Sequence, residues 1–152
     1  MDWSGDILSI VLAVVFGAAI GLEREISGKA AGLRTNVLIC LGAAVFTIIS
    51  KQMAPGTEGS LTRIAAGVVA GVGFLGAGAI IQDRGGVHGL TTAATIWLVA
   101  SIGMACAARL YLLAVVSTLI AIVVLIGLGQ LEVPLERYGR KHKRTSPRDE
   151  SS

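Results

Sequence analysis

The stretch LYLLAVVSTLIAIVVLIGL, residues 110–128, decides the class of fold, because its nineteen residues include no charged side chain. A helix rises about 1.5 Å per residue, so a run of this length matches the ~30 Å hydrocarbon core of a bilayer. A helix on the surface of a soluble protein would carry a polar face instead. The run therefore predicts a helix that spans a membrane.

Four further apolar stretches precede it, at Ile7–Leu22, Val37–Ser50, Leu61–Ile81 and Thr91–Ala107. Hydrophobic residues make up 53% of the chain and charged residues only 15%. So few charged residues could not cover the surface of a soluble domain with one core. The runs are continuous rather than alternating, which excludes a transmembrane barrel and favours helices that satisfy their own backbone amides. We therefore expect an all-α polytopic membrane protein with about five transmembrane helices.

Lys and Arg are divided unevenly between the two sides that five spans would create. Ten of the 13 fall between the first two spans, between the third and fourth, or after the fifth. The other three are Lys51, Arg63 and Arg109. Because basic residues accumulate in cytoplasmic segments, we expect the N-terminus outside and the C-terminus inside. Orientation thus explains the net charge of +3, and we expect no nucleic-acid partner.

After a transmembrane domain at residues 1–129, the sequence becomes polar and basic. Residues 130–152 carry six Lys or Arg, and we expect them to form a disordered cytoplasmic tail. Such a tail gains about 1 kcal/mol per basic residue when it lies on anionic lipid. The alternative is that its charges only fix the topology.

The run Gly71-Val72-Gly73-Phe74-Leu75-Gly76 matches the dinucleotide fingerprint, but it lies inside a spanning segment and lacks the strand and acidic residue that the fingerprint needs. Small residues spaced four apart let membrane helices approach closely. We therefore expect the third helix to be central, packed through Gly67, Gly71, Gly73, Gly76 and Gly78. The alternative is that Phe74–Gly78 is partly unwound and offers carbonyl oxygens to an ion.

A second group of candidates is polar and falls at the predicted cytoplasmic ends of the helices. Its members are Glu23, Arg24, Glu25, Arg34, Thr35, Asn36, Asp83, Thr91 and Thr92. Arg34 stands where a helix dipole disfavours a cation, so we expect it to pair with Glu23 or Asp83. The Thr and Asn residues suit helix N-caps. The alternative is that the whole group only caps helices and forms interfacial salt bridges.

Chemistry inside the membrane has little support in the sequence. No carboxylate falls near the centre of a span, which disfavours a dehydrated cation site there. Cys40 and Cys106 lack the close spacing of a metal or redox pair, so we interpret them as small buried hydrophobes. His88 is the only histidine outside the tail, and no nucleophile–base pair is evident. We expect no enzyme and no cofactor, and the sequence assigns no metal ligand.

Four runs, in this order and spacing, resemble the MgtC/SapB family of bacterial membrane proteins: Gly21–Glu25, Ala31–Asn36, Gly71–Gly78 and Gly89–Trp97. The resemblance covers roughly residues 7–128, the transmembrane domain. MgtC-type members continue into an ACT-like cytoplasmic domain with no counterpart in this sequence, and some have Asn where Thr91 stands. The resemblance implies a five-helix, multi-pass protein of the bacterial inner membrane, linked to growth in low magnesium and to virulence.

Two functions follow as expectations. The first is a non-enzymatic protein that acts in magnesium-limitation or envelope-stress adaptation by contacting other membrane proteins, or copies of itself, in the bilayer. The second is a small oligomeric transporter or channel for Mg²⁺ or protons, with a site built from Glu23, Arg34, Asp83 and the Phe74–Gly78 backbone. The first predicts binding without flux, whereas the second predicts flux in liposomes.

Overall fold

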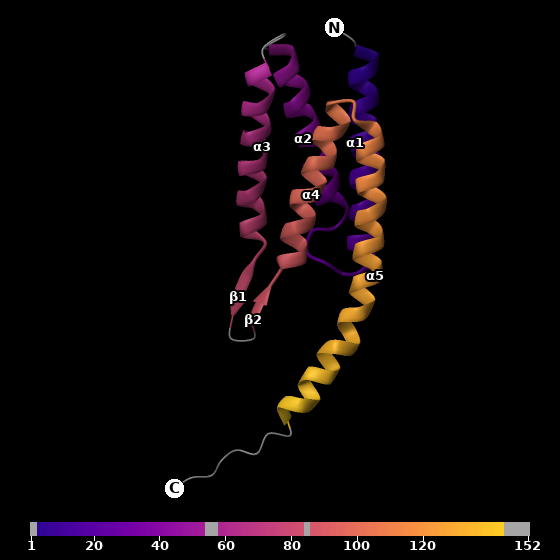
Figure 1. Cartoon of the computed structure of the whole chain (residues 1–152), viewed down its shortest axis with the longest axis vertical. Helices are drawn as coiled ribbons and strands as arrows, with labels where there is room; N and C mark the ends of the chain where they lie inside the picture. The colour runs from indigo at the N-terminus through magenta and orange to yellow at the C-terminus, as the bar shows by residue number, and fades with distance from the viewer. Residues whose placement is uncertain (1–2, 54–57, 84–85, 145–152) are drawn as a thin grey trace.

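The computed structural model describes residues 3–53, 58–83 and 86–144, and it describes the burial of side chains for residues 3–53, 62–83 and 86–129. Five helices run along one long axis (Figure 1): α1 (Trp3–Ile26), α2 (Leu33–Met53), α3 (Glu58–Gly78), α4 (Leu90–Ala107) and α5 (Tyr111–Arg144). A short antiparallel hairpin, β1 (Ile81–Asp83) and β2 (Gly86–His88), joins α3 to α4.

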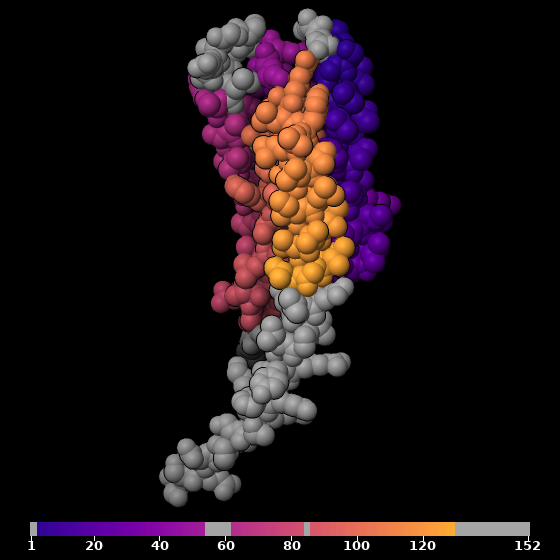
Figure 2. Space-filling view, turned by 45° about the vertical axis from the view of Figure 1, so that its right-hand side comes forward, coloured from indigo at the N-terminus to yellow at the C-terminus, as the bar shows by residue number. Residues whose placement is uncertain are grey.

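Four helical segments are long and apolar enough to cross a membrane: α1, α2, α4 and Tyr111–Gly129 of α5. The apolar part of α3, Thr62–Gly78, is slightly shorter. Large apolar side chains point outward, including Leu112 at 78% exposure on α5, the helix at the front of Figure 2. So much exposed apolar surface requires lipid as the solvent. The predicted all-α, polytopic membrane fold is confirmed, while its orientation stays a prediction.

Successive helices alternate in direction, which brings distant parts of the chain to the same end of the bundle. The α1–α2 connection, the hairpin and the start of α4 all lie at the end opposite the N-terminus (Figure 1). The connections α2–α3 and α4–α5 lie at the other end. All the polar residues singled out in the sequence therefore lie at one end of the bundle. Which of them contact one another is described below.

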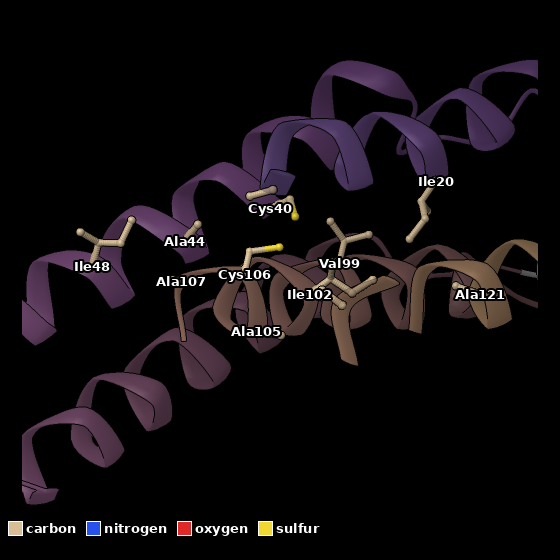
Figure 3. Packing of buried hydrophobic residues seen from close by; sticks show 12 residues of the cluster. Ile20, Cys40, Ala44, Ile48, Val99, Ile102, Ala105, Cys106, Ala107 and Ala121 are labelled. Atoms are coloured by element: carbon tan, nitrogen blue, oxygen red, sulfur yellow. The ribbon is translucent and has the colours of Figure 1, made fainter. Parts of the chain in front are cut away.

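The helix at the centre of the bundle is α4, which contacts all four other helices. Its buried Val99, Ile102 and Cys106 pack against α1 and α2 residues such as Ile20 and Cys40 (Figure 3). Both cysteines are free and fully buried, which confirms their interpretation as small buried hydrophobes. By contrast, α3 packs on α2 and α4 at the edge of the bundle. The prediction that the third helix is central is wrong for the single chain.

Most of the predicted packing glycines make no close contact with another described helix. A Cβ added at Gly67, Gly71, Gly73 or Gly78 would meet no atom within 4 Å among the described residues. Only at Gly76 would it come near a neighbour, the carbonyl oxygen of Ala93 at 3.6 Å. The spacing of glycines in the sequence shows that one face of a helix carries small residues. It does not show whether another helix packs on that face.

The glycines that do allow close packing are on α1 and α4. A Cβ at Gly17 would lie 2.9 Å from the Cβ of Cys40, and one at Gly21 would lie 2.9 Å from the Cα of Leu33. On α4, a Cβ at Gly103 would run into the carbonyl group of Cys40. These three glycines therefore bring α1 and α4 against the backbone of α2.

Two boundaries differ from the sequence-based expectation. The third helix ends at Gly78, and Ile81 belongs to β1, where it is paired with His88. The fifth helix continues to Arg144, although we expected disorder from residue 130; residues 145–152 lie outside the described residues. Leu, Glu, Arg and Lys, all good helix formers, make up nine of the fifteen residues 130–144, whereas Pro134 and Gly139 disfavour a helix.

Candidate functional site

The nine polar candidates separate into buried and exposed residues. The ends of α1 and α2 supply six of them, the hairpin one and the first turn of α4 two. The buried ones are Arg24, Asn36 and Thr92, whereas Glu23 is intermediate and Glu25, Arg34, Thr35, Asp83 and Thr91 are exposed. The functional candidates that face the protein interior are therefore fewer than the sequence suggested.

The end of α1 is fixed by a Schellman motif. The amide of Lys29 donates to the carbonyl of Arg24 at 3.0 Å, and the amide of Gly28 donates to the carbonyl of Glu25 at 3.1 Å. Gly28 has φ +65°, a left-handed conformation that glycine adopts without steric cost. This turn sends the chain back towards α2 and holds the acidic end of α1 beside the start of α2.

Glu25 caps the start of α2 from the end of α1. Its Oε2 atom accepts a hydrogen bond from the amide of Leu33, the first residue of α2, at 2.9 Å. The carboxylate thus satisfies a free amide at the positive end of the helix dipole. It also occupies the space that a side chain at position 32 would need, which explains Gly32. Thr35 and Asn36 lie within the first turn and do not cap it, contrary to our expectation.

Asn36 binds the α1–α2 connection to α2. The side chain is fully buried, and its Nδ2 atom donates to the carbonyls of Ala31 at 2.7 Å and Gly32 at 2.9 Å. Its Oδ1 atom is also buried and accepts no hydrogen bond from the described residues. Asn36 therefore shapes the connection while keeping one acceptor free for another polar group.

Arg24 is the buried cation of this end. It is 2% exposed, and its Nη1 atom lies 3.7 Å from Oε2 of Glu23. Its Nε and Nη2 atoms have no hydrogen-bond partner among the described residues. Leaving charged donors unpaired in an apolar environment is costly, so this guanidinium is suited to a polar group from outside the described chain, such as water or a partner.

A pattern in the sequence identifies Arg24 in retrospect. Gly17, Gly21 and Arg24 follow one another at intervals of four and three, so they share one face of α1. The two glycines bring that face against α2, and the same contact buries Arg24.

The predicted ion pair of Arg34 is wrong. Arg34 is exposed and forms no ion pair with any described residue. Glu23 instead lies next to Arg24 and accepts a hydrogen bond from Ser27 at 2.7 Å, and Asp83 lies 3.5 Å from His88 on the neighbouring strand. The sequence did not predict the hairpin, in which Asp83 belongs to β1 and pairs with β2 rather than with Arg34 of α2.

The start of α4 also differs from expectation. Its N-cap residue is Gly89, with φ 88° and no side-chain capping bond, so Thr91 and Thr92 do not cap it. Both lie in the first turn, where Thr92 is buried and the carbonyl of Thr91 accepts a hydrogen bond from Thr95 at 2.7 Å. Thr92 and Thr95 add buried hydroxyl groups to this end of the bundle.

A polar network at the opposite end was also missed. Asp6 accepts a hydrogen bond from Gln52 at 3.1 Å and lies 3.9 Å from Arg109. Lys51 donates to the carbonyl of Ala107 at 2.9 Å. These contacts tie α1 and α2 to the α4–α5 connection.

The transport site that we considered as an alternative is not assembled in the structure. Glu23 and Asp83 have separate partners, Arg34 stands apart, and α3 is helical through Gly78 rather than unwound. The described residues also contain no group of three or more His, Cys, Asp or Glu side chains placed to hold a metal.

A groove lies between α2 and α3. It has a volume of about 680 Å³, and the small residues Gly42, Gly67 and Gly71 contribute to its wall. Except for Arg63, all its lining residues are apolar or glycine. Two of the α3 glycines that we expected to contact other helices, Gly67 and Gly71, thus line an open groove instead.

Five antiparallel helices, a buried polar group at one end and an apolar outer surface define a small multi-pass α-helical membrane protein. Residues 10–133 match the MgtC family, and the chain belongs to that family. The resemblance to MgtC/SapB proteins is therefore confirmed. No solved structure matches this chain.

Three relatives illustrate the match. Protein MgtC of Salmonella typhimurium is 46% identical over 114 residues, which cover 75% of this chain and 48% of that protein. Putative magnesium transporter YhiD of Escherichia coli is 44% identical, over 78% of this chain and 58% of that protein. Protein SrpB of Synechococcus elongatus is 38% identical, over 86% of this chain and 79% of that protein. The chain thus spans about half of MgtC.

Proposed function

We propose that this chain is a non-enzymatic protein of the bacterial inner membrane that supports adaptation to low magnesium or envelope stress by binding other membrane proteins. The observation that carries the proposal is the outer face of α3. Ala66, Ala70, Gly73 and Ala77 follow one another at intervals of four, three and four, and all are exposed. Phe74, beside them, is 80% exposed.

Such a face is suited to another membrane helix. Apolar side chains gain little by leaving lipid, so membrane helices associate where small residues let two backbones approach. Because α3 lies at the edge of the bundle, nothing in the described chain covers this stripe. Phe74 offers a large apolar side chain beside it, which would seat against a partner.

The names of the relatives agree with a role connected to magnesium. One is called MgtC, and another carries the name putative magnesium transporter. The second name favours the alternative function, transport of Mg²⁺ or protons. The two functions differ in one measurable respect, since only transport moves ions through the purified protein.

The test combines growth and flux. In a host that lacks its own MgtC-family gene, the wild-type chain should restore growth in low magnesium, and Gly73→Leu should not. Gly127→Leu, which lies on an exposed and open part of α5, is the matched control and should restore growth. Purified protein in liposomes should show no Mg²⁺ or proton flux above empty vesicles. Growth with Gly73→Leu equal to the wild type would reject the proposed face, and measurable flux would establish the transporter.

A further inference from the structure

The groove between α2 and α3 runs along both helices on the side of α3 away from the small-residue face. Leu38 and Leu75 line one part of it, and Phe46 and Arg63 line another. Leu38, Phe46 and Leu75 are each more than half exposed, so the groove opens to the surface that faces lipid. Its volume of about 680 Å³ falls within the range of ligand-binding clefts.

The length of the groove matches one leaflet. From Arg63 to Leu75, α3 rises by about 18 Å at 1.5 Å per residue. Half of a ~30 Å hydrocarbon core is about 15 Å. A partner helix that crosses the membrane would need a groove along the full thickness, whereas a single acyl chain needs only the depth of one leaflet.

Arg63 gives the groove a charged end. It stands at the start of the apolar segment Thr62–Gly78, where the hydrocarbon meets the headgroups, and it forms no ion pair among the described residues. Among the described residues that line the groove, Arg63 is the only charged one and none is acidic. A phosphate would therefore meet a cation there, while the ammonium of a zwitterionic headgroup would find no acidic partner among the described lining residues.

We propose that this groove binds an anionic phospholipid, with one acyl chain along α2 and α3 and the phosphate on Arg63. The glycines of the groove leave room for the acyl chain, and Arg63 selects the headgroup charge. This site uses a different face of α3 from the proposed partner surface, so either can fail without the other.

Native mass spectrometry of the purified, delipidated protein tests the proposal. With equal amounts of phosphatidylglycerol and phosphatidylethanolamine, the wild type should retain phosphatidylglycerol preferentially. Arg63→Gln should weaken phosphatidylglycerol binding about fivefold and abolish the preference. The reason is that one basic residue near an anionic lipid surface contributes a factor of about five to the binding constant. Arg63→Lys keeps the charge and should keep the preference.

Substitutions of glycine test the place of the acyl chain. Gly71→Leu puts a side chain into the groove without meeting any described atom at its Cβ, and it should abolish retention of both lipids. Gly73→Leu, two residues away and outside the groove, should bind lipid as the wild type does. Equal retention of the two lipids by the wild type, or unchanged retention by Gly71→Leu, would overturn the proposal. Loss of a dimer in Gly71→Leu with lipid unchanged would assign the groove to a second copy.

Discussion

Arg24 and Asn36 place polar atoms where, among the described residues, no hydrogen-bond partner reaches them. Such atoms reduce stability unless a further group pairs with them. The two side chains nevertheless differ in what they do for the fold. The side chain of Asn36 makes two short hydrogen bonds to the α1–α2 connection, whereas the only described partner of the Arg24 guanidinium is Glu23, at 3.7 Å. Asn36 is therefore the structural member, and Arg24 is the one free to meet another molecule.

The role of Asn36 predicts a stability loss on truncation. Asn36→Ala should lower the free energy of unfolding by about 1–3 kcal/mol, because two buried carbonyl groups lose a donor. Thr35→Ala is the matched control, since Thr35 is exposed on the same turn, and it should change stability by under about 0.5 kcal/mol. Thermal unfolding in detergent measures both. A Thr35→Ala loss as large as that of Asn36→Ala would contradict the assignment.

Glu25 predicts a difference between two substitutions. Glu25→Ala removes the acceptor for the Leu33 amide and should cost about 1 kcal/mol, as the loss of a helix cap does. Glu25→Gln keeps an oxygen acceptor and loses only the attraction of a charge to the helix dipole, so its cost should be a few tenths of a kcal/mol. Unfolding in detergent at low ionic strength should resolve the order, and equal losses would mean that the cap is not the main contribution.

At this scale the sequence predicted which end of the helices carries the polar residues, but not which of them are buried. Positive charges and turn residues can be recognised from the local sequence, and they indicate where a helix ends. The burial of Arg24 and the exposure of Arg34 depend on how α1 is rotated against α2, and Gly17 and Gly21 set that rotation. Both arginines lie near helix ends, so local sequence does not distinguish them.

The helices divide their small residues between two uses. On α1 and α4, glycine allows backbones to touch, as Gly17 and Gly103 do against Cys40. On α3, glycine and alanine leave surfaces uncovered. The continuous apolar runs predicted that these helices exist, and the predicted lengths of α3 and α4 were close to those observed. Which helix occupies the centre depends on contacts between segments far apart in sequence, and hydrophobicity alone carries little of that information.

This division predicts opposite effects of one substitution on two helices. Gly17→Ala should destabilise the protein by about 1–3 kcal/mol, because the added methyl group would lie 2.9 Å from the Cβ of Cys40 in a close-packed contact. Gly67→Ala should be neutral or stabilising, because its position is open and alanine favours a helix by up to about 1 kcal/mol. The melting temperatures of the two variants in the same detergent provide the comparison. Equal destabilisation would mean that α3 is more deeply packed than the single chain shows.

The hairpin explains why prediction was weakest between α3 and α4. Its strands have only three residues each, and both are exposed, so neither a long apolar run nor an alternating pattern announces them. The last three residues of the predicted span, Ala79 to Ile81, lie beyond the end of α3, and Ile81 is the first residue of β1.

The whole molecule has two different polar ends joined by an apolar middle. At the end near the N-terminus, Asp6, Gln52 and Arg109 hold three segments together through exposed or half-buried contacts. At the other end, the Arg24–Asn36 region buries polar atoms that no described residue pairs by a hydrogen bond. The contacts at the first end stabilise the packing of the helices, whereas the polar atoms at the second end are better suited to binding another molecule. The orientation of the protein therefore decides which compartment that molecule would come from.

The balance of basic residues predicts that the Arg24–Asn36 end faces the cytoplasm. The sequence segments predicted to be on its side of the membrane contain ten Lys or Arg and the other segments three, and translocating a cluster of cations across the membrane is unfavourable. Alkaline phosphatase folds only outside the cytoplasm, so a fusion after Ser152 should be inactive and a fusion near Thr57, between α2 and α3, should be active. A green fluorescent protein fusion at the same two positions should give the complementary pattern. If the fusion near Thr57 were inactive and the one after Ser152 active, the buried arginine would face outward, and partners of this end would have to be sought outside the cell.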